Sequence, residues 1–240
     1  QEVERAQLGL SGDRADDPVY PRVTFGHGYV RDSVLELFSE NLRHYPPLLP
    51  VDLSAEPVEE LPHLRLHNGT IWRWNRLLIG FDDSGAPHLR VEQRVMPAGP
   101  SIIDMIANAA FYYGVVHMLA SQTVAPEARI PFAVARDNFY RAARYGLQAP
   151  LVWFDGQRAT AAELLARELL PLARAGLAQL ALTAGDVERY LGVIAARLQS
   201  GQNGANWQLA HYAKHHDFFR LTADYLAHQR RLMPVHEWPI

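Results

Sequence analysis

Apolar positions recur at helical or strand spacing along most of the chain, and they predict a helix-rich protein with a few short strands. The predicted helices cover residues 31–45, 101–121, 133–145, 161–180, 184–198 and 206–232. Alternating runs predict strands at 70–78, 88–95 and 150–154, and the turn signal Asp82-Asp83-Ser84-Gly85 separates the first two. We therefore expect an α+β fold in which the first two strands form an antiparallel hairpin.

Several helix ends carry recognisable signals. Ser101 can cap the long apolar helix, and Thr160 can cap a later one with Glu163 at the capping-box position. Gly146 suits the end of the helix over 133–145. Pro171 predicts a kink within 161–180, because proline cannot donate the helical hydrogen bond.

Two segments look irregular, and one long apolar run could be either a membrane span or a buried helix. Residues 1–23 are rich in Asp, Arg and Gly and indicate a linker, and residues 48–62 form a proline-rich loop. The most apolar stretch, 102–119, is interrupted by Asp104 and His117. A membrane span tolerates such residues poorly, so we predict a buried helix and no membrane partner.

Composition excludes several classes of function. The chain has 240 residues, 48% hydrophobic and 20% charged, which is enough for one domain or two small ones. A net charge of −3 provides no basic field for nucleic acid. Cysteine is absent, which excludes zinc–thiolate sites and a cysteine nucleophile and is consistent with the cytoplasm, where we place the protein.

Three charged side chains share one face of the strand over 88–95. Because side chains alternate along a strand, Arg90, Glu92 and Arg94 point to the same side. Burying all three unpaired would be costly, so they face water, partner residues or a ligand. A carboxylate can bind Mg²⁺ and a guanidinium can bind phosphate, so Glu-x-Arg suits a metal–nucleotide site. The alternative is a solvated face with local salt bridges.

The neighbouring strand adds Trp72, Arg73, Trp74 and Arg76. Arginines flanked by aromatic rings can bind an anion such as ATP phosphate, or can simply pack by cation–π contacts. Four arginines and one glutamate on the two strands leave a surplus of positive charge, which favours an anionic ligand.

The run TIWRWNRL, followed by HLRVEQRVMPAGPSIIDMIANAAFYYGV, resembles the strand pair and long helix of glutamate–cysteine ligase family 2. Asn138-Phe-Tyr-Arg-Ala-Ala-Arg144-Tyr-Gly146 is similar to a later helix of the family, and the ending His236-Glu-Trp-Pro-Ile has the look of its longer members. The resemblance covers roughly residues 24–240.

The resemblance implies a glutamine synthetase-like fold that uses ATP and Mg²⁺ to join a small amino acid to an amine through an acyl phosphate. It implies that Glu92 is the metal ligand, that Arg94 stabilises the transferring phosphoryl group, and that Arg76 contacts substrate. Further expected nucleotide or substrate contacts are Trp72, Arg73, His67, Asn138 and Arg144. For His67, and for Asn138 and Arg144, a purely structural role is the alternative.

Two departures from the family pattern affect this expectation. Trp74 stands where many relatives carry an acidic residue, and the family's early strand with two metal-binding glutamates has no counterpart here. We therefore expect residues 24–240 to be the C-terminal half of a catalytic domain, inactive alone and completed by the N-terminal half or a second subunit. A homo-oligomer is a further expectation, because a half-site would leave apolar surface uncovered.

Two rival hypotheses come from different classes of protein. The chain could be a non-catalytic dimerisation or substrate-recognition module. Alternatively, His211 and His215, four residues apart in a predicted helix, could hold zinc in a hydrolase. The glutamate of the H-E-x-x-H motif is missing, since Tyr212 follows His211, and a solvated helix face is our preferred interpretation.

Overall fold

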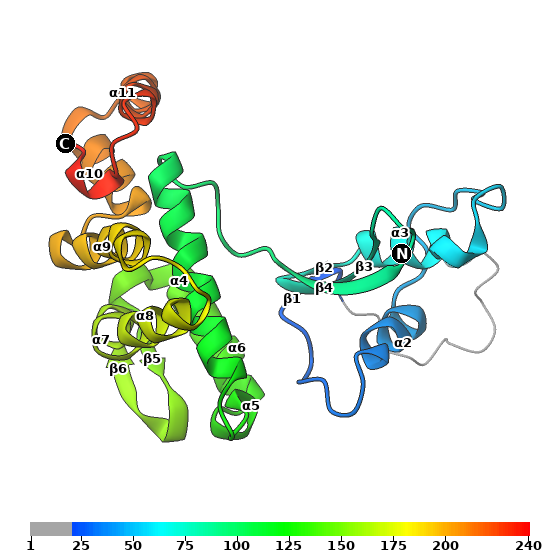
Figure 1. The fold of residues 1–240 in the computed structure, drawn as a ribbon. Coiled ribbons are helices and arrows are strands. Elements are labelled where there is room, and N and C mark those ends of the chain that lie inside the picture. The colour runs from blue at the N-terminus through cyan, green and yellow to red at the C-terminus, as the bar shows by residue number, and fades with distance from the viewer. Residues whose placement is uncertain (1–20) are drawn as a thin grey trace. The chain divides into compact units, whose positions relative to one another are not determined.

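The computed structural model describes residues 21–240, which divide into two compact units with their boundary after Val95. The predicted linker over 1–23 lies almost entirely outside the described residues, and the assignment of 24–240 to one catalytic domain stays a prediction. The α+β class is confirmed, with helices predominating over short two-stranded sheets (Figure 1).

The first unit pairs a β-hairpin with two helices. Its elements are β1 (Val23–Thr24), α2 (Leu35–His44), η1 (Val58–Glu60), α3 (Pro62–Gly69), β2 (Trp72–Arg73), β3 (Asn75–Phe81) and β4 (Pro87–Gln93). The predicted hairpin is β3–β4, in which Arg76 pairs with Glu92. The Asp82 carboxylate shapes its turn by accepting hydrogen bonds from the backbone N–H groups of Ser84 and Ala86, at 2.8 and 2.9 Å.

Two predictions in this unit were wrong in detail. The strand over 70–78 is two strands, because β2 pairs with β1 in parallel before β3 enters the hairpin. The segment after the proline-rich loop contains α3, with Pro62 in its first turn, where a missing N–H costs nothing. His67 therefore lies on a helix that the apolar pattern did not predict.

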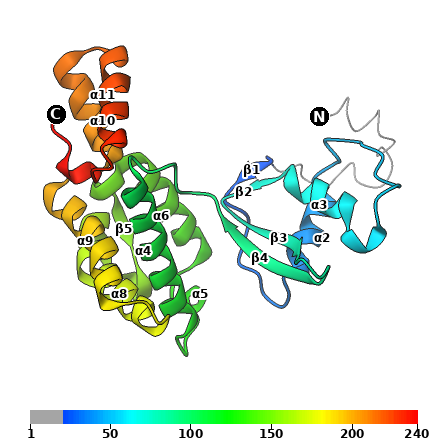
Figure 2. The same cartoon turned by 45° about the horizontal axis from the view of Figure 1, so that its top comes forward.

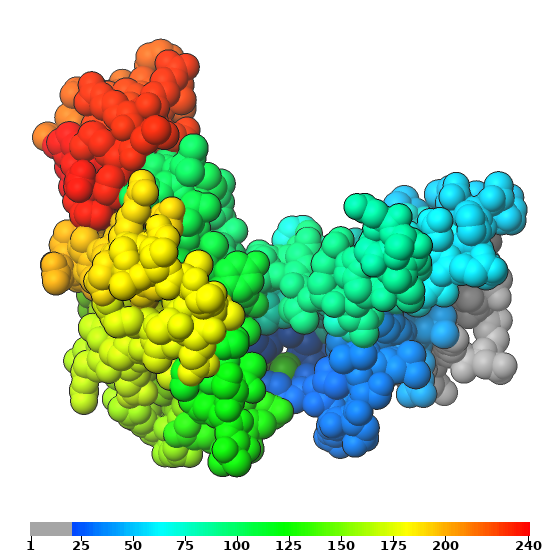
Figure 3. All heavy atoms as spheres, in the orientation of Figure 1, coloured from blue at the N-terminus to red at the C-terminus, as the bar shows by residue number. Residues whose placement is uncertain are grey.

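The second unit is built around α4 (Ile102–Ala120), which packs along two later helices (Figures 1 and 3). Its other elements are α5 (Pro126–Arg129), α6 (Phe132–Tyr145), η2 (Gly146–Gln148), β5 (Pro150–Val152), η3 (Phe154–Gly156), β6 (Arg158–Thr160), α7 (Ala161–Leu164), the π-helical turn η4 (Leu165–Leu169), α8 (Leu170–Gln179), α9 (Ala184–Ser200), α10 (Gly204–His215), α11 (Phe218–Arg230) and η5 (Val235–Glu237). The main core joins α4, α8 and α9 through Ala107, Leu170, Ala173, Leu177, Val187, Leu191, Val193 and Ile194.

The predicted helix signals are found where the sequence places them. The Ser101 hydroxyl caps α4 by accepting from the N–H of Asp104, and Thr160 and Glu163 form a capping box. Gly146 ends α6 with a positive φ of 55°. The irregularity expected at Pro171 is the π-helical turn that ends two residues before it.

The single helix predicted over 206–232 is two helices, α10 and α11, which lie side by side in Figure 2. His216 takes a left-handed conformation with φ of 51°, and the Asp217 side chain then caps α11 by accepting from the N–H of Arg220. No glycine or proline stands at this chain reversal, so the sequence does not predict it.

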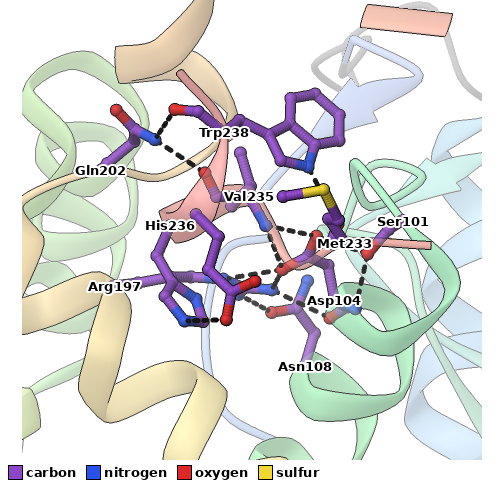
Figure 4. A network of polar contacts seen from close by, with 10 residues as sticks. Ser101, Asp104, Asn108, Arg197, Gln202, Met233, Val235, His236 and Trp238 are labelled. Carbon is purple, nitrogen blue, oxygen red and sulfur yellow. Dashed lines mark hydrogen bonds and ion pairs between the residues drawn. The ribbon is translucent and has the colours of Figure 1, made fainter. Parts of the chain in front are cut away.

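A buried polar network fastens the C-terminal segment to α4 and α9 (Figure 4). The Asp104 carboxylate is fully buried and accepts hydrogen bonds from the Ser101 hydroxyl at 2.7 Å and the Val235 N–H at 3.0 Å. It also pairs with Arg197, whose Nη1 reaches Asn108 at 2.7 Å. A buried charge with three partners from three segments fixes how those segments meet.

The prediction of a buried helix over 102–119 is half correct. One side of α4 packs in the core, but Ile102, Ile106, Tyr113 and Val116 are exposed. Within residues 21–240, α4 is the one helix long and apolar enough to cross a membrane, a test that core helices also pass. The absence of a membrane partner stays a prediction.

Candidate functional site

The hairpin presents a cluster of arginine and tryptophan side chains on one face. The register places Arg76 opposite Glu92, and the ladder continues with the Arg94 N–H donating to the Trp74 carbonyl at 2.9 Å. Glu92 and Arg94 therefore share a face, as the alternation predicted, and the register adds Arg76 to that face. Arg90 points to the same side farther along the hairpin, where it is exposed beside His88.

Glu92 links the two arginines through a single oxygen. Its Oε2 accepts hydrogen bonds from Nε and Nη2 of Arg76 at 3.1 and 2.8 Å. The same oxygen lies 3.7 Å from Nε of Arg94. Among residues 21–240, no hydrogen bond or ion pair uses the other oxygen, Oε1, which leaves it open to a further ligand.

Arg76 has little capacity left for substrate. Besides Glu92, it donates from Nη1 to the carbonyl of Gly69 at 3.0 Å and approaches that of Asn68 at 3.5 Å. These carbonyls end α3, where the helix dipole also favours a positive charge. All three guanidinium nitrogens are engaged and the side chain is 12% exposed, so Arg76 joins α3 to the hairpin.

Arg94 is different. Its guanidinium carbon lies 3.4 Å from the ring centroid of Trp72, a close cation–π contact. Trp74 meets Trp72 edge to face, with ring centroids 6.1 Å apart. Within residues 21–240, no hydrogen bond or ion pair uses Nη1 or Nη2 of Arg94, so the two nitrogens that can grip an anion in bidentate fashion are uncommitted.

Arg73 points to a separate set of contacts. Its Nη2 lies 3.0 Å from Oε1 of Glu40 on α2, and its guanidinium also covers the ring of Tyr45. His27 hydrogen-bonds the same Glu40 oxygen at 2.8 Å. Burial raises the pKa of Glu40, but the hydrogen bond from His27 and the charge of Arg73 outweigh it, so the pKa lies below its ordinary value. Arg73 thus anchors β2 to α2.

The sequence did not point to Glu40 or to the buried pair Asn41 and Asn68. Asn68 receives a hydrogen bond from Asn41 at 3.1 Å and donates to the Leu77 carbonyl at 2.8 Å, so it ties α2 and α3 to β3. No residue pattern announces such contacts, because the partners lie far apart in sequence and depend on α3, which was missed.

Asn138 and Arg144 lie in the second unit. The Asn138 amide donates to the Val152 carbonyl at 2.6 Å and accepts from its N–H at 3.0 Å, so it braces β5 against α6. The Arg144 guanidinium lies over the ring of Tyr145 at 5.3 Å and is exposed. A role for either residue in ligand binding stays a prediction.

The proposed zinc pair is not a solvated face, and that interpretation of His211 was wrong. His211 is 2% exposed, packs on Trp207 and hydrogen-bonds Asp224 through Nε2 at 2.9 Å. Its ring centroid lies 4.6 Å from that of His215. Across residues 21–240, no group of three or more His, Cys, Asp and Glu side chains is arranged to hold a metal ion.

One comparison with known proteins gives a match. A family model described as glutamate–cysteine ligase family 2 matches residues 72–224, more than half of the chain. Neither the curated proteins nor the solved structures gave a match, so the glutamine synthetase-like fold stays a prediction. The matched range starts at Trp72 and includes the whole hairpin.

Proposed function

The chain belongs to glutamate–cysteine ligase family 2, a ligase family, and from this premise we propose that it forms part of an ATP-dependent carboxylate–amine ligase. The observation that supports the proposal most directly is Arg94. Its guanidinium is held between Trp72 and Glu92, with both terminal nitrogens uncommitted among the described residues. Such a preorganised cation suits the oxygens of a phosphoryl group or carboxylate.

In the proposed reaction, a substrate carboxylate oxygen attacks the γ-phosphorus of ATP, and ADP leaves with the electrons of the broken P–O bond. The amine nitrogen then attacks the acyl carbon, phosphate leaves, and the amine loses a proton. Negative charge gathers on the phosphoryl oxygens in the first step and on the leaving phosphate in the second. Arg94 would stabilise both, while Trp72 holds its guanidinium in place.

Glu92 fits one position of a magnesium site. Magnesium is commonly held by one or two carboxylates together with substrate phosphates and water. No described residue engages Oε1 of Glu92, so this oxygen can take part, while Oε2 keeps the two arginines in place. A bound ion would neutralise phosphate charge, and the other carboxylate ligands would come from further residues or a second subunit, because the described residues form no such cluster.

We accordingly propose that this chain supplies the arginine side of the site, binds nucleotide and does not turn it over alone. The substrates would be a small amino acid and an amine, and a cytoplasmic location is part of the same proposal. The rival module hypothesis predicts no role for Arg94 beyond stability.

An assay of amine-dependent ADP release tests the proposal. In an enzyme form that includes the remaining metal-binding carboxylates, Arg94→Ala should lower kcat by about 100-fold or more, as loss of a transition-state donor does. Arg90→Ala, on the same face of β4 but exposed, is the matched control and should change kcat by less than about twofold. Equal activity in the two variants would contradict the proposal.

A further inference from the structure

The first unit contains a cavity that the proposed ligase chemistry does not use. It has a volume of about 560 Å³ and lies between α3, the end of α2 and the proline-rich segment that follows α2. This volume is within the range of small-molecule sites. The lining is mostly leucine, proline and valine, with His63, His67, Tyr45 and Thr70 as its polar members.

The apolar wall is open to solvent. Leu48, Leu49 and Val51 are 41%, 52% and 52% exposed, and they line the cavity side by side along the chain. Covering apolar surface of this kind with a ligand lowers the free energy, because the surface is removed from water. Of the residues that the structure describes, no Asp or Glu lines the cavity, so these residues offer no partner to a cationic ligand.

For His67, the structure defines which ring nitrogen donates a hydrogen bond and which can accept one. Its Nε2 lies 2.8 Å from the Tyr45 carbonyl oxygen, which can only accept, so Nε2 carries the hydrogen. In a neutral ring, Nδ1 is then an acceptor, and no hydrogen bond among residues 21–240 uses it. Burial lowers the pKa of His67 and the charge of Arg22 lowers it further, against the Tyr45 hydrogen bond, so the neutral ring predominates at neutral pH.

We propose that this cavity binds a small, uncharged, apolar molecule that donates one N–H group to Nδ1 of His67. The apolar body would cover the leucine and valine side chains, and the N–H would meet the one acceptor that the imidazole offers. An anion is disfavoured at His67, because a neutral imidazole with Nδ1 as acceptor gives it no donor there. The proposal does not depend on the ligase reaction, since it involves neither Arg94 nor Glu92.

Two probes of nearly the same shape test this directly. Indole has the N–H group, whereas benzofuran has an oxygen in its place. In calorimetric titrations at neutral pH, indole should bind, and benzofuran should bind about fivefold to tenfold more weakly, because it leaves the His67 acceptor unpaired.

Variants assign the binding to the cavity. Leu64→Trp should fill it and abolish indole binding, and His67→Phe should remove the preference for indole over benzofuran. Leu226→Trp, at an exposed position on α11, is the control and should leave indole binding unchanged. Thermal melts show that each variant is folded.

The proposal would be overturned by no indole binding, by equal binding of the two probes to the unaltered chain, by binding that survives Leu64→Trp, or by a preference for indole that survives His67→Phe. Light scattering tests whether a second copy of the chain fills the cavity instead. Self-association that Leu64→Trp abolishes would assign the cavity to that second copy and would also overturn the proposal. Arg94→Ala should leave indole binding intact, which separates this test from that of the ligase proposal.

Discussion

At the scale of single residues, the two central arginines of the hairpin differ in what they can still bind. Alternation along one strand placed Glu92 and Arg94 on one face, and the register of the hairpin adds Arg76 opposite Glu92. The sequence could not show that Arg76 is used up, because its other acceptors are the Asn68 and Gly69 carbonyls at the end of α3. Among the described residues, no hydrogen bond or ion pair uses the terminal nitrogens of Arg94, which makes it the better candidate for ligand contact.

Asn68 should be important to the stability of the first unit. It is 7% exposed, and its side chain bonds both Asn41 and the Leu77 carbonyl. Asn68→Ala should lower the free energy of unfolding by about 2 kcal/mol, because the buried partners lose their hydrogen bonds. Urea unfolding measures this, with Asn75→Ala at an exposed strand position as the control. Equal effects of the two substitutions would contradict the buried link.

His228 should make stability depend on pH. It is buried between Trp207 and Trp238, and burial, then the charge of Arg231, lowers its pKa from 6.5. The unfolded chain therefore binds a proton more readily, so the contribution of His228 is complete above about pH 6.5 and is lost as pH falls towards the folded pKa. His228→Phe should show a smaller drop in Tm between pH 7.5 and 5.5 than the unaltered chain. An equal drop would show that His228 is not responsible.

At the scale of elements, α4 and α8 cross with their backbones almost in contact. A Cβ on Gly114 would overlap the carbonyl oxygen of Ala173, and one on Gly176 would overlap that of Gly114. Neither glycine has a positive φ, so close approach is the reason for both. The sequence predicted the helices but not this contact, because a glycine within a helix carries no sign of what crosses it.

Gly114→Ala should therefore destabilise the second unit by about 3 kcal/mol through overpacking. Gly192→Ala in α9 is the matched control, because a Cβ there meets nothing within 4 Å and alanine favours a helix. Thermal unfolding should show a lower Tm for the first variant and an equal or higher Tm for the second. A tolerated Gly114→Ala would mean that the helices cross farther apart.

The elements that could be predicted are those with local signals. Capping residues and apolar periodicity gave α4, α6 and α9 to within a few residues. The chain reversal at His216 was missed because this residue takes a left-handed conformation that its type does not predict. The helix α3 was missed because it follows a proline-rich run that we interpreted as a loop. Local propensity cannot report either of these effects.

At the scale of the whole molecule, each of the two compact units has a polar tie between distant segments. In the second unit the tie is Asp104, which joins α4, α9 and the segment after α11. In the sequence, Asp104 interrupts an apolar run, and we used it only as a reason to reject a membrane span. Its partners Arg197 and Val235 lie 93 and 131 residues away, beyond the reach of any local pattern.

Asp104→Ala should lower the free energy of unfolding by about 4 kcal/mol, because it leaves Arg197 buried without its partner. Asp137→Ala removes an exposed pair with Arg136 and should cost less than about 1 kcal/mol. Denaturant unfolding of both variants measures the difference. Similar small losses would mean that the C-terminal segment is held by its apolar contacts alone.

The central claim is that Arg94, on the face of Trp72, is a working anion-binding group of a ligase. The most direct measurement is calorimetric titration of MgATP into this chain, its Arg94→Ala variant and its Arg90→Ala variant. We predict that the unaltered chain and Arg90→Ala bind MgATP and that Arg94→Ala loses at least tenfold in affinity, about 1.4 kcal/mol, as expected for a lost charge-assisted contact. Equal affinities in all three proteins, or no binding to the unaltered chain, would contradict the claim.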